Sequence, residues 1–238
     1  MKKIFVTGDT HGLFDFNKLK NFATSQKLDR SDYIIIAGDC SVVWSKELLQ
    51  EYVSAFEDLG ATILFVDGNH ENFDMLETYP ITTYLGGKVH KVSDNIYHLC
   101  RGEIFEIYGK RILALGGGES GDIAKLKEHE NWWCQERITK EDRDNTINNL
   151  VKYDNKVDLV ISHMPPTSIL PLIVEEFTCC GEALPWYIEY KVVTKISHEY
   201  LQEIADIVSF DKWYFGHIHI DVDFDKYIGM YERIQEIK

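Results

Sequence analysis

The sequence contains no long apolar run, no cluster of basic residues and no regular cysteine pattern. No apolar stretch approaches the roughly 18 residues that a membrane-spanning helix needs, which argues against a membrane protein. Because the chain lacks a Lys/Arg-rich segment and carries a net charge of −14, an extended nucleic-acid surface is also disfavoured. We interpret the acidity as that of an ordinary cytoplasmic protein.

Secretion and disulfide bonding are not indicated either. Lys2-Lys3 resembles the start of a signal peptide, but Thr7 and Gly8 interrupt the following apolar run at once. Cysteine occurs five times, an odd number with no repeating frame, and we expect reduced thiols in a reducing compartment. The cysteines are Cys40, Cys100, Cys134 and the adjacent pair Cys179-Cys180.

What the chain does have is enough apolar material for a full core. It contains 238 residues, of which 45% are hydrophobic. This length favours one domain over residues 1–238, with an insert at about 116–137. No linker or low-complexity segment divides it.

Three apolar runs in the first third of the chain predict buried strands at 3–7, 33–37 and 62–66. Apolar residues at helical spacing separate them, and these predict helices at 15–26 and 46–59. The alternation predicts an α/β fold in which the strands are parallel and their crossovers right-handed.

The middle and last parts of the chain are less regular. Short apolar runs at 96–99, 103–108 and 111–115 predict antiparallel strands of a candidate second sheet, with a turn at Gly109-Lys110. Further along we expect a helix at 140–153, a strand at 157–161, a helix at 197–208, a strand at 212–215 and a closing hairpin at 220–231.

Polar residues follow five of these strands, at the sheet edge where α/β proteins build their sites. Asp9 and His11 alternate in an extended segment, so both side chains can point the same way. The complete set is Asp9 and His11, Asp39, Asn69 and His70, His163, and His217 and His219. Imidazole and carboxylate without thiolate point to Mn, Fe, Zn or Co. A carboxylate such as Asp39 can bridge two such ions, and ions about 3.5–4 Å apart can clamp both oxygens of a phosphoryl transfer.

In this order the motifs resemble the calcineurin-like metallophosphoesterase superfamily. They are Gly-Asp-x-His at 8–11, Gly-Asp at 38–39, Gly-Asn-His-Glu at 68–71, the later His163, and Gly-His-x-His at 216–219. The resemblance implies two packed mixed β-sheets flanked by helices, a mixed α/β architecture with the metals at the carboxyl ends of strands.

The resemblance also implies roles for individual residues. One metal would take Asp9, His11, Asp39 and His219, and the other would take Asp39, Asn69, His163 and His217. A hydroxide between the metals would attack phosphorus. His70 would act near the leaving oxygen, as a general acid or as a donor to the transition state.

The chain departs from the family pattern after Asp39. Many relatives that act on phosphoproteins continue with Asp-Arg-Gly, whereas this chain continues with residues 40–44, Cys-Ser-Val-Val-Trp. The missing Arg would have gripped phosphate and the missing Asp would have oriented the catalytic His. The resemblance therefore leaves two roles unassigned: the residue that binds the phosphate group and the residue that orients His70.

Candidates for that grip lie in the insert, which opens on three glycines and lacks long apolar periodicity. We expect the insert to contribute little to the core and to border the substrate cleft. Its Lys125, Lys127 and Arg137 are either phosphate-binding residues or solvated surface charges. Trp132 and Trp133 either cover an organic leaving group or pack against the body or a second subunit.

The sequence thus predicts a dinuclear-metal hydrolase of phosphate esters, acting on a phosphorylated small molecule or an exposed phosphoester. Preference for monoester or diester is open. The alternatives are a metal-dependent nuclease and a metal-binding scaffold without activity. Four further histidines match no motif and are expected to be ordinary surface or core residues: His90, His98, His129 and His198.

Overall fold

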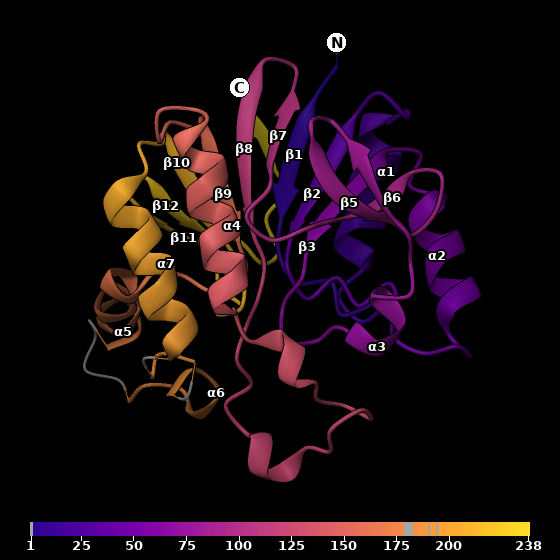
Figure 1. Cartoon of the computed structure of the whole chain (residues 1–238). Coiled ribbons are helices and arrows are strands. Elements are labelled where there is room, and N and C mark those ends of the chain that lie inside the picture. Colours follow the sequence, from indigo (N-terminus) through magenta and orange to yellow (C-terminus); the bar gives the residue numbers. More distant parts are fainter. Residues whose placement is uncertain (1, 179–182, 190, 194) are drawn as a thin grey trace.

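Two β-sheets pack face to face, and helices cover both outer faces (Figure 1). The computed structural model describes residues 2–178, 183–189, 191–193 and 195–238. This arrangement confirms the predicted architecture of two mixed sheets flanked by helices. The description of residues 1–238 as one domain with an insert stays a prediction.

The first sheet is built around the parallel strands of the predicted βαβαβ unit. In spatial order it contains β13 (Gln235–Ile237), β1 (Ile4–Thr7), β2 (Tyr33–Ala37), β3 (Thr62–Val66), β6 (Ile96–Leu99), β5 (Gly87–Lys91) and β4 (Ile81–Tyr84). β13, at one edge, is antiparallel to β1, and β4 and β5 form an antiparallel pair at the other.

The second sheet has a parallel centre with an antiparallel strand at each edge. In spatial order it contains β11 (Val222–Phe224), β12 (Tyr227–Gly229), β10 (Lys212–Phe215), β9 (Leu159–Ser162), β8 (Lys110–Leu115) and β7 (Ile104–Ile107). β11 and β12 form the expected closing hairpin.

Helices cover the outer face of each sheet (Figure 1). On the first sheet lie α1 (Asn17–Gln26), α2 (Leu49–Glu57) and α3 (Phe73–Leu76). On the second lie α4 (Lys140–Val151), α5 (Leu170–Thr178), α6 (Trp186–Glu189) and α7 (Ile196–Ile207). Short 3₁₀ turns occur at Ile123–Lys125, Cys134–Glu136 and Thr167–Ile169.

β2 shows how the sequence produces these layers. Successive strand residues face opposite sides of a sheet. Ile34 and Ile36 therefore pack under the helices, whereas Ile35 packs between the two sheets. All five residues of β2 are buried, as expected for a continuous apolar run.

Two expectations for the middle of the chain are wrong. The run at 96–99 forms β6, which joins the first sheet parallel to β3 rather than an antiparallel second sheet. The turn between β7 and β8 is Tyr108-Gly109, because both residues adopt left-handed backbone angles, with φ of 51° and 80°. Lys110 already belongs to β8.

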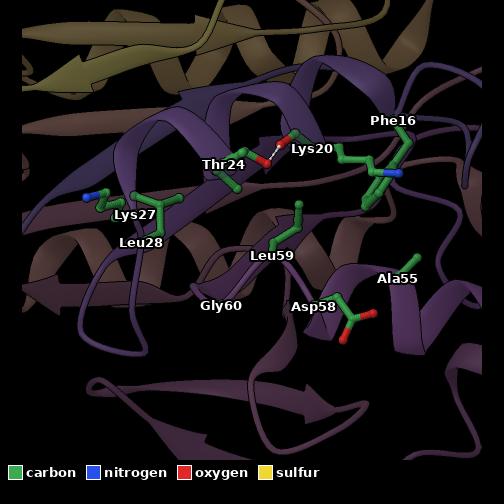
Figure 2. Close-up of a pocket in the computed structure, with 10 residues that line it drawn as sticks. Phe16, Lys20, Thr24, Lys27, Leu28, Ala55, Asp58, Leu59 and Gly60 are labelled. Carbon is green, nitrogen blue, oxygen red and sulfur yellow. Dashed lines mark hydrogen bonds between the residues drawn. The ribbon is translucent and has the colours of Figure 1, made fainter.

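A separate groove lies between α1 and α2 on the outer side of the first sheet. Figure 2 shows Phe16, Leu28 and Gly60 among its lining residues, and its volume is about 440 Å³. The one hydrogen bond drawn there runs from the Thr24 hydroxyl to the carbonyl of Lys20, within α1. None of the predicted site residues lines this groove.

Within the described ranges, no helix combines the length and apolar character needed to cross a bilayer. Cys40, Cys100 and Cys134 are unpaired. The pair Cys179-Cys180 lies outside the described residues.

Candidate metal centre

The polar residues that follow β1, β2, β3, β9 and β10 meet at one edge of the two sheets, because the carboxyl ends of parallel strands share an edge. Four of them form a first group: Asp9, His11, Asp39 and His219. One ligand atom from each lies within 4.8 Å of the ligand atoms of the others. Asp9 and Asp39 are 0% and 1% exposed, respectively.

A second group surrounds the Nε2 atom of His163. That nitrogen lies 3.3 Å from Oδ2 of Asp39, 3.2 Å from Oδ1 of Asn69 and 3.2 Å from Nδ1 of His217. Oδ2 of Asp39 also lies 3.4 Å from Nε2 of His11, in the first group. One carboxylate oxygen therefore faces both groups, and we call the two groups together the Asp/His centre.

Two of the imidazoles are oriented by hydrogen bonds on their outer nitrogens. Nδ1 of His11 lies 2.8 Å from Oδ2 of Asp15, and Nδ1 of His163 lies 3.0 Å from the carbonyl oxygen of Ala37. A proton held on Nδ1 leaves the lone pair on Nε2, which points into the centre. Histidines that bind metals commonly have such an outer partner.

The backbone carries strain at the same place. Within the described ranges, thirteen residues other than glycine have positive φ, and five of them belong to the Asp/His centre. These five are Asp9 (φ 31°), His11 (44°), Asp39 (50°), His217 (65°) and His219 (58°). Such angles cost of order 1–3 kcal/mol each and persist where the surrounding structure imposes them, which is often at functional sites.

Glycine makes room for the centre as well. A Cβ atom on Gly68 would lie 2.1 Å from Oδ1 of Asp39, and one on Gly38 would lie 2.2 Å from Nδ1 of His163. Both distances are far inside van der Waals contact, so any side chain at either position would displace a residue of the centre.

The electrostatics of the centre favour a cation. Burial opposes ionisation of Asp39, but the nearby imidazoles, foremost that of His163, hold the pKa of its carboxyl well below the ordinary value. Burial alone would lower the pKa of His11, but Asp39 and other carboxylates raise it to about 9. Nε2 of His219 is buried, lies 3.5 Å from Oδ1 of Asp9 and makes no closer hydrogen bond in the described part of the protein. Buried carboxylates and an imidazole nitrogen without a closer partner are the donor set that a divalent transition metal fits.

His70 lies exposed at the rim of the centre. Its backbone N–H donates to Oδ1 of Asp39 at 2.7 Å, and its backbone carbonyl accepts a hydrogen bond from the Ser41 hydroxyl at 2.5 Å. Glu71, the next residue, accepts the N–H groups of Cys40 and Ser41 at 2.8 and 3.0 Å. The segment that replaces Asp-Arg-Gly thus holds the backbone at His70. Among the described residues, none hydrogen-bonds to the His70 imidazole.

A cleft of about 370 Å³ opens beside His70. It is lined by His11, Phe14, Asp15, Ser41, Trp44, Tyr52, His70 and His219. Phe14 is 85% exposed, whereas Tyr52 is 8% exposed. The cleft therefore combines residues of the centre with an aromatic wall.

The insert lies between β8 and α4, below the two sheets in the view of Figure 1. Its three predicted phosphate-binding residues are exposed and do not line the cleft: Lys125, Lys127 and Arg137. Lys127 lies 3.4 Å from Glu130, and Arg137 lies 3.7 Å from Glu119.

The tryptophans of the insert differ from each other. Trp133 is only 1% exposed, so the insert contributes more to the core than expected. Its indole N–H donates to Oδ2 of Asp74 at 2.8 Å, and its ring contacts Trp44 edge-on at 5.7 Å. Trp132 is half-buried, and its indole N–H donates to Glu136 at 2.9 Å. Trp133 therefore supports the aromatic wall of the cleft from behind.

The structure also places Lys191 beside the centre, which the sequence did not indicate. The ammonium group of Lys191 donates a hydrogen bond to the carbonyl of His217. Burial lowers the pKa of Lys191, against the opposing effect of Asp9 and Asp39. Lys191 belongs to no motif, and its proximity arises from packing alone.

Comparisons with known proteins agree with this geometry. A family model described as calcineurin-like phosphoesterase matches residues 2–221. One solved structure with 13% sequence identity has a TM-score of 0.56, covering 96% of this chain and 89% of its own. The crystal structure of TT1561 of Thermus thermophilus, with 10% identity, has a TM-score of 0.51 and covers 99% of this chain and 97% of its own. At such identities these two likenesses concern the fold alone. No curated protein matches the chain.

Proposed function

Because the chain belongs to the calcineurin-like phosphoesterase family, we propose that it hydrolyses phosphate esters with the help of two divalent transition metal ions. The observation that carries this proposal is the position of Asp39, whose Oδ2 atom faces His11 at 3.4 Å and His163 at 3.3 Å. A single carboxylate between two groups of donors is the arrangement that two neighbouring cations require.

The donor residues divide into two proposed sites. One ion would be held by Asp9, His11, Asp39 and His219, and the other by Asp39, Asn69, His163 and His217. Nitrogen and oxygen donors without thiolate suit Mn, Fe, Zn or Co. When bound, these ions would supply Lewis acidity toward the phosphoryl oxygens and lower the pKa of water.

The chain itself would supply orientation and a proton. Asp15 and the carbonyl of Ala37 fix the rings of His11 and His163. We assign His70 the role of donor to the leaving oxygen. Its side chain lies on the rim of the cleft, and its backbone N–H is fixed by a hydrogen bond to Asp39. The exposed position of its imidazole leaves the ring free to meet a substrate.

The shape of the cleft favours a compact substrate. A volume of about 370 Å³ is at the lower end of the range for small-molecule sites. The phosphate would lie beside His11 and His219, and the organic group would lie against Phe14, Trp44 and Tyr52. We therefore propose a phosphorylated small molecule, or a phosphoester that protrudes from a larger one.

Two sources can supply the phosphate grip. The insert offers Lys125, Lys127 and Arg137, the candidates from the sequence, whose side chains are exposed. Lys191 offers an ammonium group already held next to His217. Both remain proposals, and single substitutions separate them.

Activity assays with a substrate panel test the proposed function. Phosphorylated metabolites, phosphopeptides, cyclic nucleotides and single-stranded DNA would each be incubated with the protein and Mn²⁺. We expect turnover of small phosphate esters above that of DNA. Efficient DNA cleavage with no turnover of small esters would identify a nuclease, and no turnover of any substrate by Mn²⁺-loaded protein would indicate a scaffold.

A further inference from the structure

A second group of potential metal ligands lies on the antiparallel part of the first sheet, outside the Asp/His centre. His90 on β5 pairs directly across the strands with His98 on β6. Cys100 follows two residues after His98, and its N–H donates to the Lys88 carbonyl at 3.1 Å, which continues the strand pairing. Residues two apart on a strand share a face, so Cys100 and His98 lie on the same side.

The three side chains converge. One ligand atom from each of His90, His98 and Cys100 lies within 4.8 Å of the other two. The two imidazole rings are stacked, with centroids 5.2 Å apart, and their Nδ1 atoms lie 2.9 Å from each other. We propose that these residues form a separate site for Zn²⁺ or a chemically similar ion.

A buried carboxylate orients the central ligand. Nε2 of His98 lies 3.0 Å from Oδ1 of Asp67, and both side chains are almost fully buried. Asp67 is in turn held by Arg101, whose Nε lies 2.9 Å from its Oδ2. With its proton on Nε2, His98 presents the lone pair of Nδ1 toward His90 and Cys100. A carboxylate behind a histidine is the usual outer partner at zinc sites.

The donor set selects the ion. Two imidazoles and one thiolate favour Zn²⁺ over Mg²⁺, Ca²⁺ or Mn²⁺, which prefer oxygen ligands. The Asp/His centre contains no thiolate, so the two sites differ in chemistry. A cavity of about 260 Å³ opens onto His90, His98 and Cys100 and includes Glu77, so water or a carboxylate can take the fourth position.

Binding of the ion changes where the protons of Cys100 and His90 lie. Burial, together with Glu103, raises the pKa of the Cys100 thiol to about 12, so sulfur loses its proton only as it bonds to the cation. One proton is then released to solvent. Burial and the neighbouring His98 lower the pKa of His90 to about 4, so its ring is neutral at pH 7. The ring proton of His90 moves to Nε2 when Nδ1 binds the ion.

Cobalt tests the proposal, because a Co²⁺–thiolate bond gives a near-ultraviolet charge-transfer band that nitrogen and oxygen ligands do not give. The full-length protein would be stripped of metal, titrated with Co²⁺ and followed by absorption. We expect the band to saturate by three equivalents, since the Asp/His centre also takes Co²⁺, and to disappear when Zn²⁺ is added. Neither outcome depends on phosphoesterase activity, so this site can fail while the proposed function stands.

Three variants locate the ligands. Cys100→Ser should abolish the band, whereas the matched control Cys134→Ser, which removes an exposed cysteine, should leave it unchanged. His90→Ala, at a half-buried position, should raise the Co²⁺ concentration needed for half-saturation by at least tenfold. Circular dichroism would verify folding. Absence of the band in the wild-type protein, or a full band in folded Cys100→Ser, would overturn the proposal.

Discussion

Asp39 is the residue on which both groups of donors depend. Its Oδ2 atom faces His11 and His163, while its Oδ1 atom accepts the N–H of His70. We therefore expect Asp39→Ala to lose both Mn²⁺ ions and nearly all activity. Metal analysis after dialysis against Mn²⁺, combined with assays on an aryl phosphate, measures both effects in one preparation.

His70 should behave differently, because its imidazole lies at the rim rather than inside the centre. His70→Ala is expected to keep both Mn²⁺ ions and to lose roughly 10²–10⁴-fold in kcat, the usual contribution of a positioned proton donor. Equal loss of metal in the two variants would show that His70 is a ligand and that its proposed role is wrong.

Four cations compete for the role of the missing Arg. The substitutions Lys125→Ala, Lys127→Ala, Arg137→Ala and Lys191→Ala would be made one at a time, with metal content verified in each. Loss of a phosphate-binding residue should lower kcat/KM at least about tenfold, ~1.4 kcal/mol of transition-state stabilisation. Kinetics on the best substrate of the panel decide among them, and wild-type values in all four variants would mean that none of these cations holds the phosphate.

β2 and β3, which are buried on both faces, were readable from the sequence, whereas β4 and β5 were not. β2 and β3 begin and end at the predicted residues because both consist of continuous apolar runs. β4 carries three exposed residues and β5 alternates with lysines, so neither stands out from a loop. β5 forms because β6 offers an edge on which it pairs, and β4 in turn pairs with β5.

The insert is a second example of structure that the sequence pattern does not reveal. It lacks the periodicity of a core element, yet Trp133 is buried through contacts with Trp44 and Asp74, which are distant in sequence. A pattern of neighbouring residues cannot reveal such packing. The carboxyl ends of the strands, in contrast, could be aligned in advance because parallel pairing fixes their common edge.

Arg101 connects β6, the insert and α4, and provides a stability test. It is paired with Asp67, which is 1% exposed, and lies 3.1 Å from Asp142. We expect Arg101→Met to reduce the free energy of unfolding by about 3–5 kcal/mol, because the buried Asp67 carboxylate loses its guanidinium partner and keeps only the hydrogen bond to His98. Urea denaturation measures this loss.

A matched control distinguishes burial from pairing as such. Arg143 pairs with Glu203 at 2.6 Å, but both side chains are well exposed. Arg143→Met should therefore cost less than about 1 kcal/mol. Adding Asp67→Asn to Arg101→Met should recover part of the loss, since the buried charge that has lost its guanidinium partner is then removed. Similar losses of stability in the two arginine variants would contradict the view that the burial of Asp67 makes its pairing with Arg101 important.

Across the whole molecule, the fold brings motif residues that are spread from position 9 to position 219 of the chain to one edge of the two sheets. The sequence supplied the motif residues and their strands, and the family they indicate is confirmed by the match over residues 2–221. It could not supply the outer partners Asp15 and Ala37 or the cation Lys191, since nothing local marks them. Metal binding by the motif residues stays a prediction until ions are counted.

The central claim is that hydrolysis requires two ions in the Asp/His centre. Measuring bound Mn²⁺ and activity in the same titration tests it most directly. Mn²⁺ is chosen because a site with a thiolate disfavours it, so its stoichiometry reports on the Asp/His centre. The chelated protein should be inactive toward an aryl phosphate, and activity should return as Mn²⁺ binding reaches two ions per chain. Full activity in protein shown to be free of metal would contradict the proposed dinuclear mechanism.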